Sequence, residues 1–395
     1  MATSTVARRA GGPADAVGGL VPQEVVRPTT VREVVQVMRD AAADGRTVVP
    51  VGGGTKRSWA ATPTSCDLLL DTTGLDRVVE HVAGDLIVVA EAGVRLADLQ
   101  SHVGRAGQLL GLDPAEPAAT LGGVVSANAS GPRRLRYGTV RDLLIGTSVV
   151  LADGTFASSG GKVVKNVAGY DLGKLYTGAH GTLGVVVSTT WRLHPVPTAR
   201  RVVVLDLPDA SAAGPLALRL AGSTLTPSAV ELFAIAGGAG QLVVLFESIA
   251  ESVAAQAASA VRLLGGGTES GELPAAFGRR PGEPDEVVLR LAYLPTALTE
   301  VLAALPAGAS LAASACTGVA YAAVPAAGAA ASLADLRAAL VAYDGTAVVL
   351  RAPEGVAQTL DHWGPVGDSV ELMRRVKDRF DPEHRLSPGR FVGGI

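Results

Sequence analysis

The stretch from residue 120 to residue 184 constrains this chain more than any other. It opens with the glycine-rich run 120–131 and closes with a second such run, 178–184. Between them, the apolar and β-branched run 143–151 predicts a buried strand. Glycines allow another group to approach the backbone closely, and successive amides can bind an anion. The stretch therefore predicts strands that hold backbone loops against a long, flat, anionic ligand.

A further glycine-rich segment, Gly-Gly-Gly-Thr-Lys at residues 52–56, follows the predicted strand 47–51. Thr55 adds a hydroxyl group to it and Lys56 adds a positive charge. The segment lacks the spacing of a Walker A loop, and the helix and acidic residue of a Rossmann fingerprint do not follow it. From these residues alone, a phosphate-binding loop and an ordinary tight turn are both open.

Length and composition restrict the class of protein. The 395 residues suffice for two domains, and 48% hydrophobic against 18% charged residues excludes extensive disorder. A formal net charge of −3 gives no general attraction to nucleic acid or to an anionic membrane. The two cysteines, Cys66 and Cys316, match no metal or disulfide pattern, which is typical of a reducing compartment.

No targeting or spanning segment is visible. No apolar run approaches the roughly 18 residues of a membrane span, and no hydrophobic signal core follows Arg8 and Arg9. We therefore expect a cytoplasmic protein without a transmembrane segment. Attachment to the inner face of the membrane through partner proteins stays open.

The first half of the chain predicts a mixed α and β domain, residues 21–197, after a flexible N-terminus, residues 1–20. Thr30 and Glu33 have the spacing of a capping box at the start of a helix. Further elements are expected as strands at 67–71, 78–82, 86–92, 143–151 and 185–193, and as helices at 95–102 and 124–128. The prolines after residue 194 mark the end of this domain.

The second half alternates strands and helices in two similar passes over residues 201–352. This order predicts an α+β cap domain, residues 198–365, in which one antiparallel sheet carries its helices on one face. A last helix, 369–379, lies in a C-terminal segment, 366–395, that we expect to return to the first domain. The predicted fold class is therefore α+β.

Several segments together resemble a known family. They are the glycine loops 52–55 and 120–128, Gly-Pro-Arg-Arg at 131–134, Val-Arg-Asp at 140–142, Lys-Asn-Val-Ala-Gly-Tyr-Asp-Leu at 165–172, the run 178–184, and the tail motifs 380–382 and 388–390. They resemble the PCMH-type FAD-binding domain of the vanillyl-alcohol-oxidase superfamily, and within it the FAD-binding subunits of bacterial glycolate oxidases. The resemblance covers about residues 20–195 and the tail, and it is loose in between.

The resemblance implies two α+β subdomains that clasp FAD, with the cap domain after them. The expected FAD contacts are Gly52, Gly53, Gly54, Thr55, Lys56, Thr120, Leu121, Gly122, Gly123, Ala127, Asn128, Ser130, Gly181, Thr182, Gly184, Val185 and Val186. Covalent flavin links in this family use His or Cys at defined positions. Because residues 52–57 contain no His and the first His after Pro195 is His362, we expect noncovalent FAD.

By the same resemblance, we expect oxidation of a small 2-hydroxy acid such as glycolate by hydride transfer to FAD. Related 2-hydroxy-acid dehydrogenases use a metal held by His and Glu in the cap, but residues 195–361 contain no His, so we expect no metal. This favours a hetero-oligomer with a catalytic flavoprotein and an iron–sulfur subunit. A standalone FAD-dependent oxidase or dehydrogenase of another alcohol, and a non-catalytic FAD-holding electron-relay subunit, are the alternatives.

Three residues are candidates for a role in catalysis. Arg290, in the apolar strand 286–294, could clamp a substrate carboxylate, or it could face solvent on a one-sided sheet. Lys165 and Asn166 lie in a closely matching motif and are candidates for positions near the flavin. We assign no catalytic base.

Overall fold

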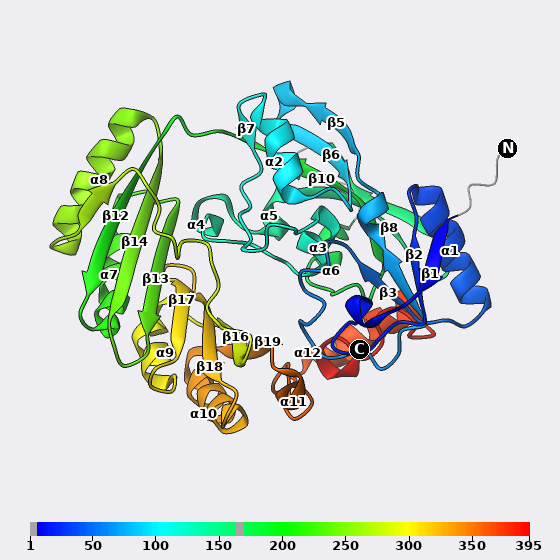
Figure 1. The fold of residues 1–395 in the computed structure, drawn as a ribbon. Helices are drawn as coiled ribbons and strands as arrows, with labels where there is room; N and C mark the ends of the chain where they lie inside the picture. The colour runs from blue at the N-terminus through cyan, green and yellow to red at the C-terminus, as the bar shows by residue number, and fades with distance from the viewer. Residues whose placement is uncertain (1–5, 163–169) are drawn as a thin grey trace. The chain divides into compact units, whose positions relative to one another are not determined.

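The structure is a computed structural model that describes residues 6–162 and 170–395. It divides into two compact units (Figure 1). Unit 1 contains residues 1–130, 138–196 and 365–395, and unit 2 contains residues 131–137 and 197–364. The α+β class is confirmed in both units.

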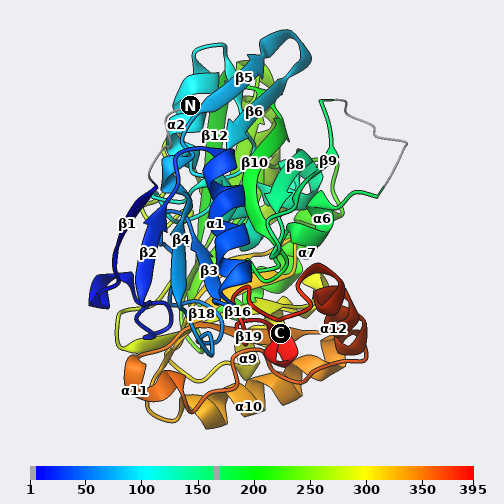
Figure 2. The same cartoon turned by 90° about the vertical axis from the view of Figure 1, so that its right-hand side faces the viewer.

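Unit 1 begins with a sheet of strand order β1-β2-β4-β3, formed by β1 (Ala7–Ala10), β2 (Glu24–Arg27), β4 (Leu68–Asp71) and β3 (Val48–Val51). β2 and β3 run parallel to β4, whereas β1 is antiparallel to β2. Helix α1 (Val31–Ala43) lies beside β4 (Figure 2). It buries Val34, Val37 and Met38 in a core that also contains Leu68 and Leu70 of β4.

The capping box that starts α1 is confirmed. The Glu33 amide donates to Thr30 Oγ1 at 3.2 Å, and the Thr30 amide donates to Glu33 Oε2 at 3.2 Å. The expectation of a flexible segment over residues 1–20 is wrong for Ala7–Ala10, because these residues pair with β2. All four are exposed, so no apolar alternation marks the strand in the sequence.

The second sheet of unit 1 is antiparallel, in the order β5-β6-β10-β8-β9. Its strands are β5 (Val78–Val82), β6 (Ile87–Glu91), β10 (Val185–Arg192), β8 (Leu144–Val150) and β9 (Phe156–Gly160). The strands expected at 78–82 and 86–92 are β5 and β6, which pair as an antiparallel hairpin. The shorter elements around it are α2 (Leu96–Gly104), β7 (Gln108–Leu109), α3 (Leu121–Ser126), α5 (Val140–Leu143), α6 (Gly173–Tyr176) and β11 (His194–Pro195).

Unit 2 contains one antiparallel sheet, whose described strands follow the order β15-β12-β14-β13-β17-β18-β16-β19. They are β12 (Ala199–Leu207), β13 (Ala229–Ile235), β14 (Gly240–Ser248), β15 (Thr268–Ser270), β16 (Glu286–Ala292), β17 (Ser310–Ser314), β18 (Val319–Pro325) and β19 (Thr346–Arg351). The helices are α4 (Arg134–Tyr137), α7 (Ala213–Ala221), α8 (Ala250–Leu264), α9 (Leu298–Ala304), α10 (Ala329–Leu340) and α11 (Glu354–Ala357).

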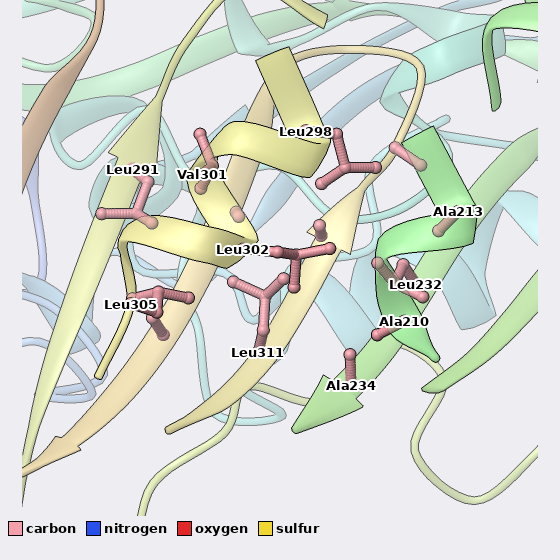
Figure 3. Close-up of a cluster of buried hydrophobic side chains, with 14 of the residues drawn as sticks. Ala210, Ala213, Leu232, Ala234, Leu291, Leu298, Val301, Leu302, Leu305 and Leu311 are labelled. Carbon is pink, nitrogen blue, oxygen red and sulfur yellow. The ribbon is translucent and has the colours of Figure 1, made fainter. Parts of the chain in front are cut away.

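One face of this sheet is covered by α7 to α10, which share a single apolar core with it. Leu298, Val301 and Leu302 of α9 meet strand residues such as Leu311 and Leu232 there (Figure 3). The predicted antiparallel cap with its helices on one face is thus confirmed. Strand β15 is an addition, because its three residues lie in a glycine-rich stretch with no alternating pattern.

The C-terminal helix α12 (Ser369–Phe380) and the tail after it belong to unit 1. The tail runs beside β3, where Val48 N donates to Arg385 O at 2.8 Å and Ser387 N donates to Val48 O at 2.9 Å. The chain end is therefore built into the edge of the first sheet. Over the described residues, none of the helices combines the length and the apolar composition needed to cross a membrane.

Candidate functional site

A cavity in unit 1 lies where three loops meet. The loops follow β3, surround the start of α3, and precede β10. The lining residues are Pro50, Val51, Gly52, Gly53, Gly54, Thr55, Lys56, Arg57, Thr72, Ala119, Thr120, Gly122, Gly123, Ser126, Ala127, His180, Gly181, Gly184, Val185, Val186 and Arg390. Segments that are far apart in the sequence thus form one concave surface, as a small-molecule site requires.

Most of the residues expected from the sequence to contact FAD line this cavity, including loop 52–56, Thr120, Gly123 and Gly181. Four do not, and they are Leu121, Asn128, Ser130 and Thr182. Leu121 is fully buried in the protein. Thr182 is buried with its hydroxyl donating to Ala179 O at 2.7 Å, so both residues support the loops from behind.

The loop amides give the cavity its chemical character. Among the described residues, the amides of Gly54, Thr55, Gly123 and Gly181 donate to no protein acceptor. Amides that lack a protein partner require water or a ligand, and several of them together bind anions. The cavity is therefore suited to a phosphate-containing ligand.

The start of α3 offers the cavity fewer unpaired amides than a free helix N-terminus would. Two of its first amides are taken, since Leu121 N donates to Val94 O at 2.9 Å and Gly122 N donates to Ala92 O at 2.8 Å. Only the Gly123 amide is left among the first three helical residues. The turn after β6 therefore occupies two of the first three amides of α3.

The glycines of the cavity have different roles. A Cβ on Gly52 would lie 2.1 Å from Thr120 Oγ1, and a Cβ on Gly53 would lie 1.9 Å from Ala118 O. On Gly122 it would lie 2.9 Å from the Ala92 Cβ, so these three glycines are required by protein packing. A Cβ on Gly123 would meet only Thr120 Oγ1, at 3.3 Å. Gly123 is therefore the glycine whose open side is left for a ligand.

Two non-glycine residues near the cavity have left-handed backbone conformations, Asn128 at φ 46° and His180 at φ 51°. Such conformations cost free energy and persist where the surrounding structure enforces them. The His180 amide donates to Ser126 O at 2.9 Å, and its ring lies 5.9 Å from the ring of Phe391. His180 thus connects α3 to the C-terminal tail and also lines the cavity.

Arg390 is a lining residue to which the sequence analysis gave no role. Its Nη2 donates to the carbonyl oxygens of Lys56, Arg57 and Trp59 at 3.0, 3.3 and 3.1 Å. Burial lowers the pKa of this guanidinium to about 10. The side chain thereby fixes the loop after Gly54, and only the Pro-Gly-Arg motif could have pointed to it.

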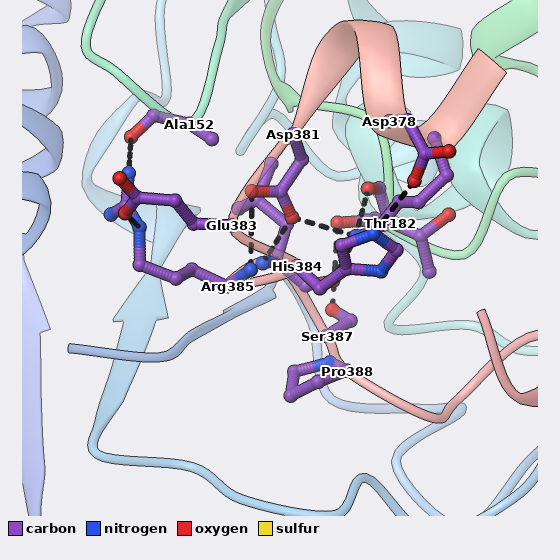
Figure 4. A network of polar contacts seen from close by, with 12 residues as sticks. Ala152, Thr182, Asp378, Asp381, Glu383, His384, Arg385, Ser387 and Pro388 are labelled. Atoms are coloured by element: carbon purple, nitrogen blue, oxygen red, sulfur yellow. Dashed lines mark hydrogen bonds and ion pairs between the residues drawn. The ribbon is translucent and has the colours of Figure 1, made fainter. Parts of the chain in front are cut away.

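The loop 181–184 is held by a buried ion pair. Lys377 Nζ donates to Asp381 Oδ2, Thr182 O and Leu386 O at 2.7, 2.8 and 2.9 Å. Asp381 also accepts the amides of Arg385 and Leu386 at 3.1 and 2.7 Å (Figure 4). Burial lowers the pKa of Lys377, although Asp381 acts in the opposite direction. The tail and this cavity loop are thus one hydrogen-bonded network.

Lys56 is placed differently from a simple phosphate ligand. Its Nζ lies 2.7 Å from Glu116 Oε2 and 5.0 Å from the ring centroid of Trp59. Its positive charge is therefore largely neutralised by Glu116.

A second, more polar cavity of unit 1 shares Gly52–Gly54, Arg57 and Thr120 with the first, and it extends the concave surface toward Arg95 and Asp98.

The remaining candidates are not part of this cavity. Arg290 lies on β16 of unit 2. Lys165 and Asn166 fall outside the described residues. Within the described part of the chain, no group of three or more His, Cys, Asp or Glu is arranged to hold a metal ion. Burial raises the pKa of the Cys66 and Cys316 thiols to about 11, which disfavours the reactive thiolate.

Comparison with known families assigns this site to a class. Residues 22–160 match the FAD binding domain family, and residues 356–391 match the C-terminal domain family of FAD linked oxidases. Residues 22–160 are therefore similar to FAD-binding domains, and all the cavity residues outside 180–186 lie in the two matched segments.

Relatives of known activity match parts of the chain. The glycolate oxidase subunit GlcD of Bacillus subtilis is 30% identical over 53% of this chain and 45% of its own length. The D-lactate dehydrogenase of Archaeoglobus fulgidus is 36% identical over 47% of this chain and 41% of its own length. The mitochondrial D-2-hydroxyglutarate dehydrogenase of Bos taurus is 34% identical over 47% and 34% of the two chains. The matches thus span less than half of each relative.

A solved structure of alkyldihydroxyacetonephosphate synthase has a similar fold. It aligns with a TM-score of 0.70 over 93% of this chain and 76% of its own length, at 16% sequence identity. At that identity the likeness concerns the fold alone.

Proposed function

We propose that this protein is an FAD-dependent oxidoreductase that acts on the CH–OH group of a small 2-hydroxy acid such as glycolate. The cavity of unit 1 carries the proposal. Several of its loop amides have no protein acceptor, and the loops that contain Gly54, Thr55 and Gly123 lie in the segment that matches FAD-binding domains. Relatives named for glycolate, D-lactate and D-2-hydroxyglutarate match about half of this chain.

FAD binds noncovalently in this proposal, since residues 52–57 contain no His. The amides of Gly54, Thr55 and Gly123 would hold the pyrophosphate, and Gly181, Gly184 and Val185 would contact the dinucleotide through the backbone. Bound flavin supplies a hydride acceptor.

The substrate carboxylate is bound by Arg290, whose guanidinium can make two parallel hydrogen bonds to it. No hydrogen bond or ion pair joins Arg290 to another described residue, so its donors are available. Lys165 and Asn166 are proposed to lie near the flavin, on the basis of their motif alone. No metal takes part in the proposed reaction.

The proposed assembly is a hetero-oligomer with a catalytic flavoprotein and an iron–sulfur subunit, in keeping with the name of the GlcD relative as a subunit. The alternatives are a standalone oxidase or dehydrogenase of another alcohol and an electron-relay subunit. Each of the three requires bound FAD.

An anaerobic titration tests the proposal. Gently purified protein should be yellow, and glycolate, D-lactate or D-2-hydroxyglutarate should bleach the flavin, either alone or after co-expressed partner subunits are added. Bleaching only with partners supports the component over the standalone enzyme. Flavin that stays oxidised with all three acids, in both settings, contradicts 2-hydroxy-acid oxidation. A flavin-free protein contradicts the proposal as a whole.

A further inference from the structure

The sheet of unit 2 has one face that α7 to α10 do not cover, and Arg290 lies on it. Its neighbours Leu289 and Leu291 enter the core shared with the helices, so Arg290 projects to the opposite face. On the adjacent strand β18, Ala320 and Ala322 enter the same core, and Tyr321 therefore shares the face of Arg290. The two residues are direct cross-strand partners.

A second guanidinium covers Tyr321 from the segment that precedes β16. The Arg280 guanidinium carbon lies 4.6 Å from the centroid of the Tyr321 ring. The segment is fixed to the sheet, because Arg351 Nη2 donates to the carbonyl oxygens of Gly282 and Glu283 at 3.2 and 2.6 Å. These two hydrogen bonds hold the segment that carries Arg280 against the sheet, with its guanidinium over the Tyr321 ring.

The groups that face Tyr321 are predominantly cationic. They are Arg290 on β16, Arg280 on the preceding segment and Arg134 on α4, while β17 presents the apolar Ala312. The nearest acidic side chain on that face of β16, Glu286, accepts the Glu283 amide at 2.9 Å. Burial by itself would raise the pKa of the Tyr321 phenol, but Arg280, Arg134 and Arg290 outweigh it and lower this pKa to about 8.

We propose that Tyr321 is the acid–base residue of the oxidation, and that Arg290 and Arg280 bind the carboxylate of the same 2-hydroxy acid. This assignment rests on the proposed function. A 2-hydroxy acid offers a carboxylate and a neighbouring hydroxyl group. The two guanidiniums pair with the carboxylate, and the adjacent Tyr321 phenolate accepts the proton of the hydroxyl. Unit 2 supplies this chemistry without a histidine or a metal.

The proton and electron balance of the step is complete. The Tyr321 phenolate takes the hydroxyl proton and becomes a phenol, while the substrate carbon and oxygen form a C=O double bond. The broken C–H bond leaves with its electron pair as a hydride, which the flavin accepts. Pairing of the carboxylate with the guanidiniums also removes positive charge near Tyr321, so the phenolate becomes a stronger base once substrate is bound.

The first experiment measures the ionisation of Tyr321 in the flavin-containing protein by ultraviolet difference titration against Tyr321→Phe. One tyrosine should titrate near pH 8 in the wild type and be absent from the variant. Oxalate, a carboxylate that cannot be oxidised by this reaction, should shift that titration upward by about one pH unit. In Arg290→Gln, the titration should lie higher without oxalate and respond less to it. A tyrosine that titrates near pH 8 in both proteins, or that ignores oxalate, overturns the proposal.

The second experiment measures flavin reduction by the 2-hydroxy acid that bleaches the wild type. Tyr321→Phe should lower the rate of reduction by about 100-fold or more with little change in substrate affinity, whereas Arg290→Gln should mainly weaken affinity. The pH profile of kcat/KM should rise through about pH 8 in the wild type and lose this limb in Tyr321→Phe. Tyr343→Phe is the matched control on the helix-covered side.

The outcomes separate the two proposals. If Tyr321→Phe reduces its flavin at the wild-type rate, the role of Tyr321 is wrong and the proposed function stands. If no 2-hydroxy acid reduces the wild-type flavin in the presence of partners, the proposed function is wrong, and the role of Tyr321 falls with it.

Discussion

The ammonium group of Lys377 lies 2.7 Å from Asp381 Oδ2, and both side chains are completely buried. The same ammonium holds the carbonyl oxygens of Thr182 and Leu386. The pair therefore connects the last helix to a loop of the cofactor cavity. Removal of one partner leaves the other charge buried without compensation.

Lys377→Met should therefore lower the free energy of unfolding by about 3–5 kcal/mol, because Asp381 keeps its burial and loses its counter-ion. Urea denaturation measures the loss, and flavin content at a temperature where the variant is folded measures the effect on the loop. The exposed Arg375→Met on the same helix is the control. A variant as stable as that control contradicts the structural role of the pair.

Gly123→Val should remove most of the bound flavin and leave the fold intact. A Cβ at this position meets only Thr120 Oγ1, so its branches extend into the space left for the ligand. We expect flavin affinity to fall at least about tenfold, or ~1.4 kcal/mol. Gly122→Val should instead destabilise the protein, because its Cβ would press against Ala92.

The control for these two substitutions is Gly84→Val, which has no neighbour within contact distance. Flavin stoichiometry and thermal unfolding should be measured for all three proteins. Full flavin content in a folded Gly123→Val protein would show that the ligand does not approach this backbone.

Arg390→Met should destabilise the loop after Gly54 and lower flavin affinity. Three carbonyl oxygens lose their charged donor, and we expect a loss of about 2–4 kcal/mol in unfolding free energy. Increased proteolysis near residues 56–59 would report the local effect. Arg379→Met, exposed on α12, should show neither change.

In unit 2, Arg133 makes three hydrogen-bond contacts of 2.7–3.2 Å with the buried Glu247. Arg133→Met should lower the free energy of unfolding by about 2 kcal/mol. This value lies between the contributions of exposed and buried ion pairs, because Arg133 is partly accessible. The double variant Arg133→Met/Glu247→Leu should recover part of this loss. An additive double-mutant cycle would mean that the two residues do not act as a pair.

Asp67 makes stability depend on pH. The amide and hydroxyl of Thr47 donate to its Oδ2 at 2.8 and 2.7 Å, and these bonds lower the pKa of the carboxyl below 3.8. A lowered folded pKa gives stability that is complete above the ordinary pKa and is lost as the pH falls through the folded value. The free energy of unfolding of the wild type should thus exceed that of Asp67→Asn by about 1 kcal/mol at neutral pH. This difference should shrink toward pH 3.

Urea midpoints at several pH values test this, with the exposed Asp76→Asn as the control. A constant gap between wild type and Asp67→Asn across the acid range would contradict the assignment.

Local sequence signals predicted the local structure well. The capping box of Thr30 and Glu33, the strands at 78–82 and 86–92 and the order of strands and helices in the cap all depend on neighbours in the chain, and the structure contains all three. Strand β1 was missed because its four residues are all exposed and show no apolar alternation.

The parts that could not be predicted depend on contacts over long sequence separations. Arg133 pairs with a residue 114 positions away, which brings residues 131–137 into unit 2. The amide of Gly122 is occupied by Ala92, and Arg390 holds carbonyl oxygens more than 330 positions back. No periodicity or motif spacing in the sequence encodes such partners.

The discontinuity of unit 1 has a consequence for its synthesis. Its last segment, residues 365–395, is made only after the whole sheet of unit 2, and that segment supplies Lys377 and Arg390 to loops translated more than a hundred residues earlier. The cofactor cavity therefore cannot mature during translation of its own domain. Nascent chains should gain FAD affinity in one late step, and loops 52–57 and 181–184 should stay protease-sensitive until residue 390 has left the ribosome.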